Sequence, residues 1–132
     1  MRAVLDPNIL ISALISPMGP PARVVARWLA GDFELVVSEL LLREFEDAVA
    51  SPKLRKRITA EEASELLDLL RRAASVAADP PGGSYRSADP NDDYLLALAE
   101  AERALIVTGD AHLLALASDL PVLTAAEFVA SL

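Results

Sequence analysis

Short, wholly apolar runs alternate along this chain with longer stretches in which apolar residues recur every three or four positions. Runs that are apolar on both faces are typical of parallel strands, and the longer spacing is typical of helices packed on a sheet. The pattern predicts strands at 3–5, 33–37, 105–108 and 121–123, and a weak edge strand at 76–78. Because strands and helices alternate throughout, we expect an α/β fold, a three-layer sandwich whose central, mainly parallel sheet has about four to five strands.

Helix start and stop signals divide the rest of the chain. The predicted helices lie at 9–15, 22–30, 39–50, 60–74, 90–99, 111–117 and from 125 onward. Ser38 is expected to cap the third helix, and Thr59 and Thr124 each begin a capping box, in which a Glu three residues later completes the reciprocal bonds. Five residues of the third helix are expected to face the core: Leu40, Leu41, Phe45, Ala48 and Val49. The clearest loop is 79–84, and without repeats or an internal boundary we expect one domain, 1–132.

The composition restricts the chemistry that the chain can support. The absence of Cys and the presence of a single His exclude disulfides, thiolate nucleophiles, and Cys-ligated or His-rich zinc sites. The net charge of −8 argues against a general nucleic-acid coat, although an acidic protein still binds a polyanion where metal ions and a basic patch share a cleft. No apolar run approaches the roughly 20 residues of a membrane span and no signal-peptide pattern is present, so we expect a cytoplasmic protein without membrane contact.

Acidic residues recur where the predicted strands and helices meet. Asp6 and Asp110 directly follow strands, and open parallel sheets bind ligands outside the carboxyl ends of their strands. Glu44 lies two turns into the helix after the second strand, and Asp93 lies in the first turn of the helix before the strand at 105–108. Within about 5 Å of one another, each pair of these charges would repel by roughly 3 kcal/mol, so protonation or a divalent cation must relieve the cluster. Oxygen ligands without His or Cys suit Mg²⁺ or Mn²⁺.

Each acid also has a simpler interpretation when it is considered alone. These simpler roles are a first-turn helix acid for Asp92 and Asp93, a helix cap for Asp110, and a solvated helix residue for Glu44. Two assignments stay open, because Asp92 is an alternative ligand to Asp93, and Glu46 is an alternative to Glu44 that faces another side of the helix. The acid that ends the first strand is the hardest to explain without a site, since no capping box follows it.

The acids lie in stretches that together resemble the PIN domain family. The matching stretches are LDPNILISAL at 5–14, Glu44, DPNDDYLLALA at 89–99 and VTGD at 107–110. They follow the order of the family across essentially the whole chain, and the likeness is greatest to the VapC-like branch, the toxin ribonucleases of toxin–antitoxin systems. The resemblance implies a Mg²⁺- or Mn²⁺-dependent endoribonuclease that hydrolyses RNA phosphodiesters. It implies metal ligands at Asp6, Glu44, Asp93 and Asp110, with Asn8 and Thr108 as polar supports.

The resemblance also implies partners, and it includes one departure. A cognate antitoxin, whose basic side chain would enter the acidic cleft, and a homodimer are expected. Pro7 stands where the family usually has Thr or Ser, which removes an N–H and a hydroxyl from the metal rim. This departure keeps open the alternative of a catalytically weak or degenerate PIN domain that acts as a protein- or RNA-binding module.

Further polar and basic residues are candidates for contact with the substrate. Ser12 and Thr108 are placed to orient a phosphate or a metal-bound water. The candidates for RNA phosphates are Arg43, Lys53, Arg55, Lys56, Arg57 and Arg86. The segment 53–57 also has a simpler explanation, which we favour, as a solvated connection between helices. Trp28 is expected in the core or at a dimer face, and His112 is expected to be structural or a proton carrier near Asp110.

Overall fold

A sheet of five parallel strands crosses the middle of the computed structural model, which describes residues 1–83, 86–87 and 89–132. The strands are β1 (Arg2–Leu5), β2 (Glu34–Val37), β3 (Ser75–Val76), β4 (Leu105–Val107) and β5 (Val122–Leu123), in the order β3-β2-β1-β4-β5. Every neighbouring pair is parallel. The predicted α/β fold is confirmed, and the weak strand expected near 76 is the outer edge of the sheet. Ser84, the last residue of the predicted loop, lies outside the described residues.

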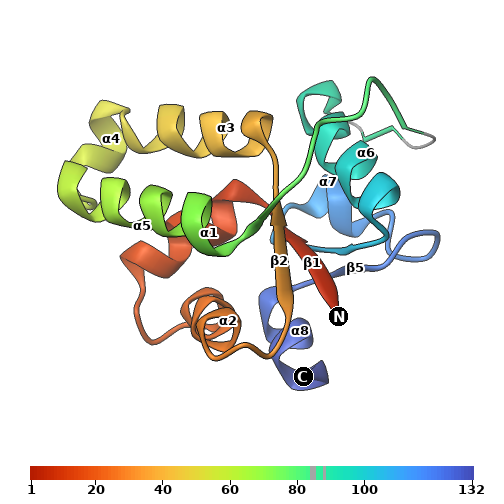
Figure 1. Ribbon diagram of the computed structural model, residues 1–132, viewed down its shortest axis with the longest axis horizontal. Helices are drawn as coiled ribbons and strands as arrows, with labels where there is room; N and C mark the ends of the chain where they lie inside the picture. The colour runs from red at the N-terminus through yellow and green to blue at the C-terminus, as the bar shows by residue number, and fades with distance from the viewer. Residues whose placement is uncertain (84–85, 88) are drawn as a thin grey trace.

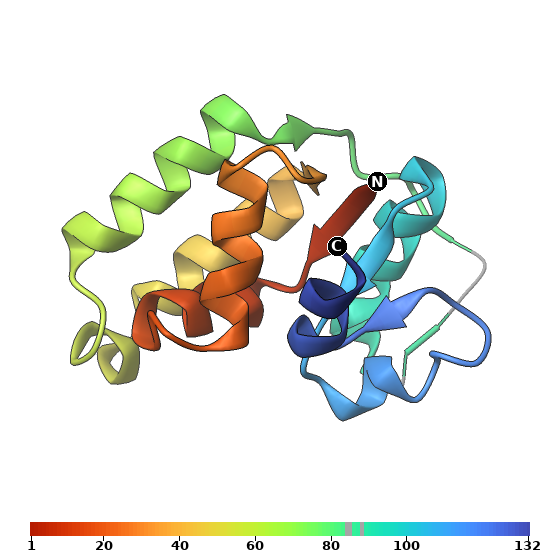
Figure 2. The ribbon, with the colours of Figure 1, turned by 90° about the horizontal axis from the view of Figure 1, so that it is seen from below.

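Helices cover the sheet on both sides. They are α1 (Pro7–Ile15), α2 (Pro20–Leu29), α3 (Glu39–Val49), α4 (Pro52–Arg55), α5 (Ala60–Ala73), α6 (Asp93–Glu102), α7 (Ala111–Leu114) and α8 (Ala125–Ser131), with the 3-10 turn η1 (Pro90–Asp92) before α6. Figure 1 and Figure 2 both show α1 to α5 on one side of β1 and α6 and α7 on the other. α8 packs against α2. The end of β1 therefore lies between two groups of helices.

Capping residues set the ends of several helices as the sequence predicted. Ser38 Oγ accepts the N–H three residues further on at 3.3 Å, and Thr59 and Thr124 both form complete capping boxes. Several helices differ from their predicted bounds: α1 begins at Pro7 instead of residue 9, α6 spans Asp93–Glu102 instead of 90–99, and α4 lies where no helix was predicted. α2 already begins at Pro20, because proline fits the first turn of a helix, and α7 ends at Leu114, because the following residues form turns.

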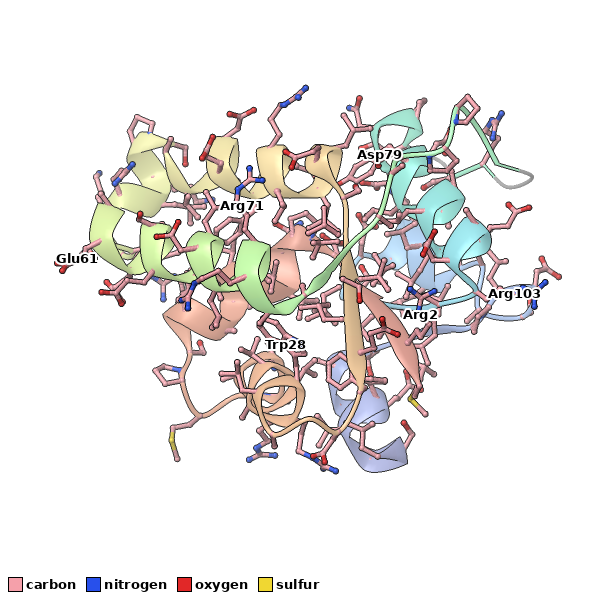
Figure 3. All side chains as sticks on the ribbon, in the orientation of Figure 1. Arg2, Trp28, Glu61, Arg71, Asp79 and Arg103 are labelled. Atoms are coloured by element: carbon pink, nitrogen blue, oxygen red, sulfur yellow. The ribbon has the colours of Figure 1, made fainter. Side chains whose placement is uncertain are left out.

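The core fills the space between the sheet and the helices, and α3 contributes a large part of it. Leu41, Leu42 and Phe45 are completely buried. The prediction that Leu40 faces the core was wrong, because its side chain is 41% exposed. Successive helical residues are about 100° apart, so the buried stripe lies one residue further round than the sequence pattern indicated. Trp28, labelled in Figure 3, is buried on α2 and belongs to the core.

The register of the strands brings two polar residues together at the carboxyl edge of the sheet. Leu5 pairs with Val107, so β1 and β4 end at the same level. The N–H of Asp6 donates to the Val107 carbonyl at 3.0 Å, which places Thr108 beside Asp6. The strand order also changes direction between β1 and β4, and open α/β sheets bind ligands at such switch points.

No helix in the described ranges is long and apolar enough to cross a membrane by itself. α1 and α2 reach the required length and composition only as a pair, and they are bent by 103° at the loop between them.

Candidate active site

Asp6 directly follows β1, caps α1 and lies almost entirely inside the protein, with 5% of its surface exposed. Its Oδ1 accepts the N–H of Asn8 at 2.9 Å, and its Oδ2 accepts the hydroxyl of Thr108 at 2.8 Å. Burial raises the pKa of Asp6, the bonds from Asn8 and Thr108 offset part of this rise, and the charge of Asp110 adds to it. The Asp6 carboxyl group is thus held in place by two hydrogen bonds, and none of the described residues forms an ion pair with it.

Thr108 connects Asp6 to Asp110. Its hydroxyl is completely buried, donates to the Asp6 carboxylate and accepts the backbone N–H of Asp110 at 3.0 Å, so that one oxygen connects the two residues. Asp110 caps α7, because its Oδ1 accepts the N–H of His112 at 2.7 Å. The His112 ring is exposed, and its Nδ1 lies 3.7 Å from the same oxygen. Asp6 and Asp110 therefore each cap a helix and also belong to the group of acids.

The structure distinguishes the two adjacent acids that the sequence left as alternatives. Asp93, which we preferred from the sequence, is directed to the preceding loop, where its Oδ1 accepts the N–H of Ser87 at 2.7 Å and its Oδ2 lies 3.7 Å from Arg86 Nε. Asp92, which we placed second, has a buried Oδ2 without a hydrogen-bond partner in the described part of the chain. Burial raises the pKa of Asp92 to about 6, and the charges of Asp110, Asp6, Asp89 and Glu44 contribute to this rise. Asp92 is therefore the acid of this pair that lies with the cluster.

Glu44 reaches the same region from α3. Its Oε2 accepts the hydroxyl of Tyr94, which lies in the first turn of α6. Burial, the bond to Glu44, and the charges of Glu44, Asp6 and Asp92 raise the pKa of Tyr94, so its hydroxyl stays protonated and acts as the donor. Glu46, the alternative to Glu44, is exposed on another side of α3. The acids brought together are thus Asp6, Glu44, Asp92 and Asp110, from four different segments.

The polar residues expected at the rim lie on α1. Asn8 binds Asp6 through its backbone N–H, and its side chain is exposed. Ser12 lies one turn further along the same face and donates no hydrogen bond to the acids among the residues described. Pro7 occupies the first position of α1, where an N–H has no partner within the helix. Its presence therefore leaves the capping turn at Asp6 intact.

The basic residues proposed for phosphate contact fall into two groups. Five of them are exposed on or just after α3 and α4: Arg43, Lys53, Arg55, Lys56 and Arg57. α3 has 11 residues and spans about 16 Å, so the segment 53–57 lies at the far end of α3 from the strand edge (Figure 1). Arg86 is nearer to the acids, donates to the Gly83 carbonyl at 2.8 Å and lies beside Asp93.

The amino edge of the sheet carries a cavity of about 690 Å³, between the end of α6 and the start of β4. Its lining includes Arg2, Leu96, Arg103, Leu105 and Pro121, and it includes none of the four clustered acids. Figure 3 shows Arg2 and Arg103 at this edge, where Arg2 forms ion pairs with Glu34 and Glu102. The convergence of acids, and not the size of a cavity, identifies the candidate site.

Tyr94 is the residue of the site that the sequence did not reveal. A tyrosine in a helix rich in leucine and alanine is most simply a core residue, and its spacing from Glu44 along the chain carries no information about their contact. The available signal was its position two residues after Asp92, in the turn that supplies an acid to the cluster.

The chemistry of the donors fits a hard divalent cation. Every candidate ligand atom is a carboxylate oxygen, and the Asp92 Oδ2 is buried with no hydrogen-bond partner among the described residues. Across residues 1–83, 86–87 and 89–132, no three His, Asp or Glu side chains are arranged, as they stand, to hold one metal ion. The carboxylates therefore have to move closer together before they share an ion.

Comparison with known proteins assigns this arrangement to a family. A family model described as the PIN domain matches residues 2–112, from β1 to the first turn of α7. The chain belongs to the PIN domain family. PIN domains are nucleases, which supports hydrolysis as the reaction class of this PIN domain.

Individual proteins show the same likeness. This PIN domain is 30% identical over 118 residues to the uncharacterized protein MJ1680 of Methanocaldococcus jannaschii, covering 88% of this chain and 75% of that protein. Its fold is similar to that of PAE2754 from Pyrobaculum aerophilum, with a TM-score of 0.68 and 19% identity over 99% of this chain and 88% of the other. VapBC-1 from nontypeable Haemophilus influenzae has a TM-score of 0.65 and 18% identity, covering 96% of this chain and 99% of the other. At these identities the solved structures show a shared fold.

Proposed function

We propose that this PIN domain is a Mg²⁺- or Mn²⁺-dependent endoribonuclease and the toxin of a toxin–antitoxin pair. The observation that carries the proposal is the buried Oδ2 of Asp92, which has no hydrogen-bond partner in the part of the chain that the structure describes and whose electrostatic neighbours include Asp6, Glu44 and Asp110. Carboxylates so close together repel one another unless a cation or a proton offsets their charge. Membership of a nuclease family favours a bound cation over a proton, because metal-assisted hydrolysis uses such a site.

The residues of the site have distinct roles in this proposal. Asp6, Glu44, Asp92 and Asp110 would hold the ion. When bound, a divalent cation lowers the pKa of water and stabilises the charge that develops on the attacked phosphate. Thr108 orients the carboxyl group of Asp6 and holds the backbone of Asp110, and the N–H of Asn8 fixes the second oxygen of Asp6. No side chain is required as the nucleophile.

The substrate and the protein partners are also part of the proposal. RNA as the substrate is supported by the exposed basic segment 53–57, since phosphate contacts come first from Lys and Arg. An antitoxin partner and a homodimer are supported by the resemblance to the VapC-like branch and by the similar fold of VapBC-1. Four clustered carboxylates attract Arg as well as a metal ion, so an antitoxin would block the site with a basic side chain.

Cleavage assays on three aspartate variants test the proposal. With Mn²⁺ and an excess of enzyme over structured or unstructured RNA, the wild type is expected to cleave, and EDTA is expected to abolish cleavage. Asp6→Asn and Asp92→Asn each remove a charged ligand, so cleavage is expected to fall on the order of 100-fold or more. Asp93→Asn is the matched control on the neighbouring residue, and its cleavage rate is expected to fall by about tenfold or less.

Two results would contradict the proposal. The first is cleavage by Asp6→Asn or Asp92→Asn at the wild-type rate, which would show that the acids are not needed. The second is an absence of metal-dependent cleavage of every RNA by the wild type. In that case, RNA binding without cleavage would favour the alternative of a degenerate PIN domain that acts as a binding module.

A further inference from the structure

We propose that Tyr94 is a positioning residue: its hydroxyl holds the Glu44 carboxylate toward the other acids and thereby increases the affinity of the site for a divalent cation. The inference rests on the proposed function and extends it to a residue outside the acidic set. The observation that carries it is the hydrogen bond from the Tyr94 hydroxyl to Glu44 Oε2, which joins α6 to α3.

The location of Tyr94 suits this role. Its side chain is half-buried in the first turn of α6. It contacts Glu44 through its hydroxyl, and it follows Asp92 by two residues in the sequence. The two helices lie on opposite sides of β1 (Figure 1), so the bond crosses the edge of the sheet at which Asp6 ends its strand. The charges of Asp6 and Asp92 act on the hydroxyl, which places it among the acids.

Glu44 needs such a donor more than the aspartates do. Asp6 is fixed by two donors and Asp110 by one, each of them from the same turn or the adjacent strand. Glu44 has a longer side chain in the middle of a helix, and among the described residues the Tyr94 hydroxyl is its only hydrogen-bond donor. Without that donor, the repulsion of the other acids and the gain in rotational freedom would both favour a Glu44 that points to solvent.

The hydrogen bond does not block the carboxylate. A carboxylate has about four lone-pair sites on two oxygens, and the Tyr94 hydroxyl occupies one of them on Oε2. Oε1 accepts no hydrogen bond from the described residues. Tyr94 can therefore direct Glu44 toward the cluster while an oxygen remains available for a cation.

A double-mutant cycle on Mn²⁺ binding tests the inference. Calorimetric titration of the metal-free, full-length protein with MnCl₂ gives the dissociation constant for the wild type, Tyr94→Phe, Glu44→Gln and the double variant. Tyr94→Phe keeps the ring and loses only the donor, so we expect Mn²⁺ binding to weaken about threefold to tenfold, as for the loss of one net hydrogen bond. In the Glu44→Gln background the same substitution is expected to have no further effect. Glu46→Gln, exposed on the same helix, is the matched control.

The outcomes separate the inference from the proposed function. If the wild type binds Mn²⁺ and Tyr94→Phe binds it equally well or more tightly, the inference is overturned and the proposed metal site stands. Equal effects of Tyr94→Phe with and without Glu44 would show that Tyr94 acts elsewhere, which also overturns it. No Mn²⁺ binding by the wild type would overturn both. If Tyr94 had a purely structural role, Tyr94→Phe would lower the melting temperature of the metal-free protein without changing its Mn²⁺ affinity. If Tyr94→Phe does not fold, Tyr94→Met is measured in its place.

Discussion

Two aspartates that are adjacent in the chain have opposite surroundings in this PIN domain. Asp93 has the N–H of Ser87 and the guanidinium of Arg86 beside it. Asp92 has a buried oxygen that no described residue hydrogen-bonds, and it has four acidic neighbours, whose charges favour its neutral form. At the scale of single residues, the charged form of Asp92 is therefore repelled by the neighbouring acids, and protonation or a bound cation relieves this repulsion.

The stability of the metal-free protein is expected to reflect this repulsion. The pKa of Asp92 is raised to about 6 in the folded state, so the proton stabilises the fold at low pH. This stabilisation is fully present below the ordinary aspartate pKa of about 4 and is lost as the pH rises through about 6. The measurement is urea unfolding in the presence of EDTA at pH 4 and at pH 7.5. From the lower to the higher pH, the free energy of unfolding of Asp92→Asn is expected to rise by about 1 to 3 kcal/mol relative to that of the wild type, after allowance for solvent screening. A difference that does not change with pH would contradict this account.

At the scale of elements, α3 delivers Glu44 to the site, and its first turn is held from two directions. Ser38 Oγ accepts the N–H of Leu41 at 3.3 Å, and Asp79 Oδ2 accepts the N–H of Leu40 at 3.1 Å. Figure 3 shows Asp79 on the segment that runs past the start of α3 toward α6. Because Ser38 directly follows β2, the cap fixes the direction in which the helix leaves the sheet.

Two cap substitutions distinguish general stability from the position of α3. Ser38→Ala and Thr59→Ala each remove a capping side chain, and each is expected to lower the free energy of unfolding by about 1 kcal/mol. Only Ser38→Ala displaces the helix that carries Glu44, so only this variant is expected to bind Mn²⁺ more weakly, by about threefold or more. Equal Mn²⁺ affinity of the two variants would show that the cap on α3 does not position the site.

At the scale of the whole molecule, charge is distributed unevenly. The net charge is −8, and the acids gather at the carboxyl edge of the sheet while the basic segment 53–57 is exposed at the far end of α3. An acidic protein repels RNA at long range, so a local basic surface must supply the attraction. In the proposed ribonuclease, the basic segment would bind a strand of RNA and the acidic cluster would cleave it.

The salt dependence of RNA binding tests this arrangement. Replacing Lys53, Arg55, Lys56 and Arg57 by Gln, in the Asp6→Asn background to prevent cleavage, is expected to weaken binding to single-stranded RNA. The slope of log K against log salt is expected to decrease by about 0.7 for each phosphate that the protein no longer neutralises. Arg23→Gln, an exposed change on α2, is the control and is expected to leave the slope unchanged. An unchanged slope in the fourfold variant would exclude the segment from RNA binding.

The sequence by itself determined the fold class, because each signal acts over a few residues: apolar runs for the strands, periodic stripes for the helices, and Ser38, Thr59 and Thr124 for the caps. It also placed Asp6 and Asp110 at one edge of a sheet, since both follow strands that had to be parallel. It did not determine that Leu40 is exposed, because neighbouring apolar residues of a helix differ only in their angle to the core.

The tertiary structure decided which acid of the pair Asp92 and Asp93 joins the cluster, and it revealed the contact between Tyr94 and Glu44. Both depend on how α6 is rotated against the sheet and on what the loop before it contacts, and neither is encoded in local spacing. The orientation of a side chain about a helix axis is set by the packing of distant segments, so only the folded chain fixes it.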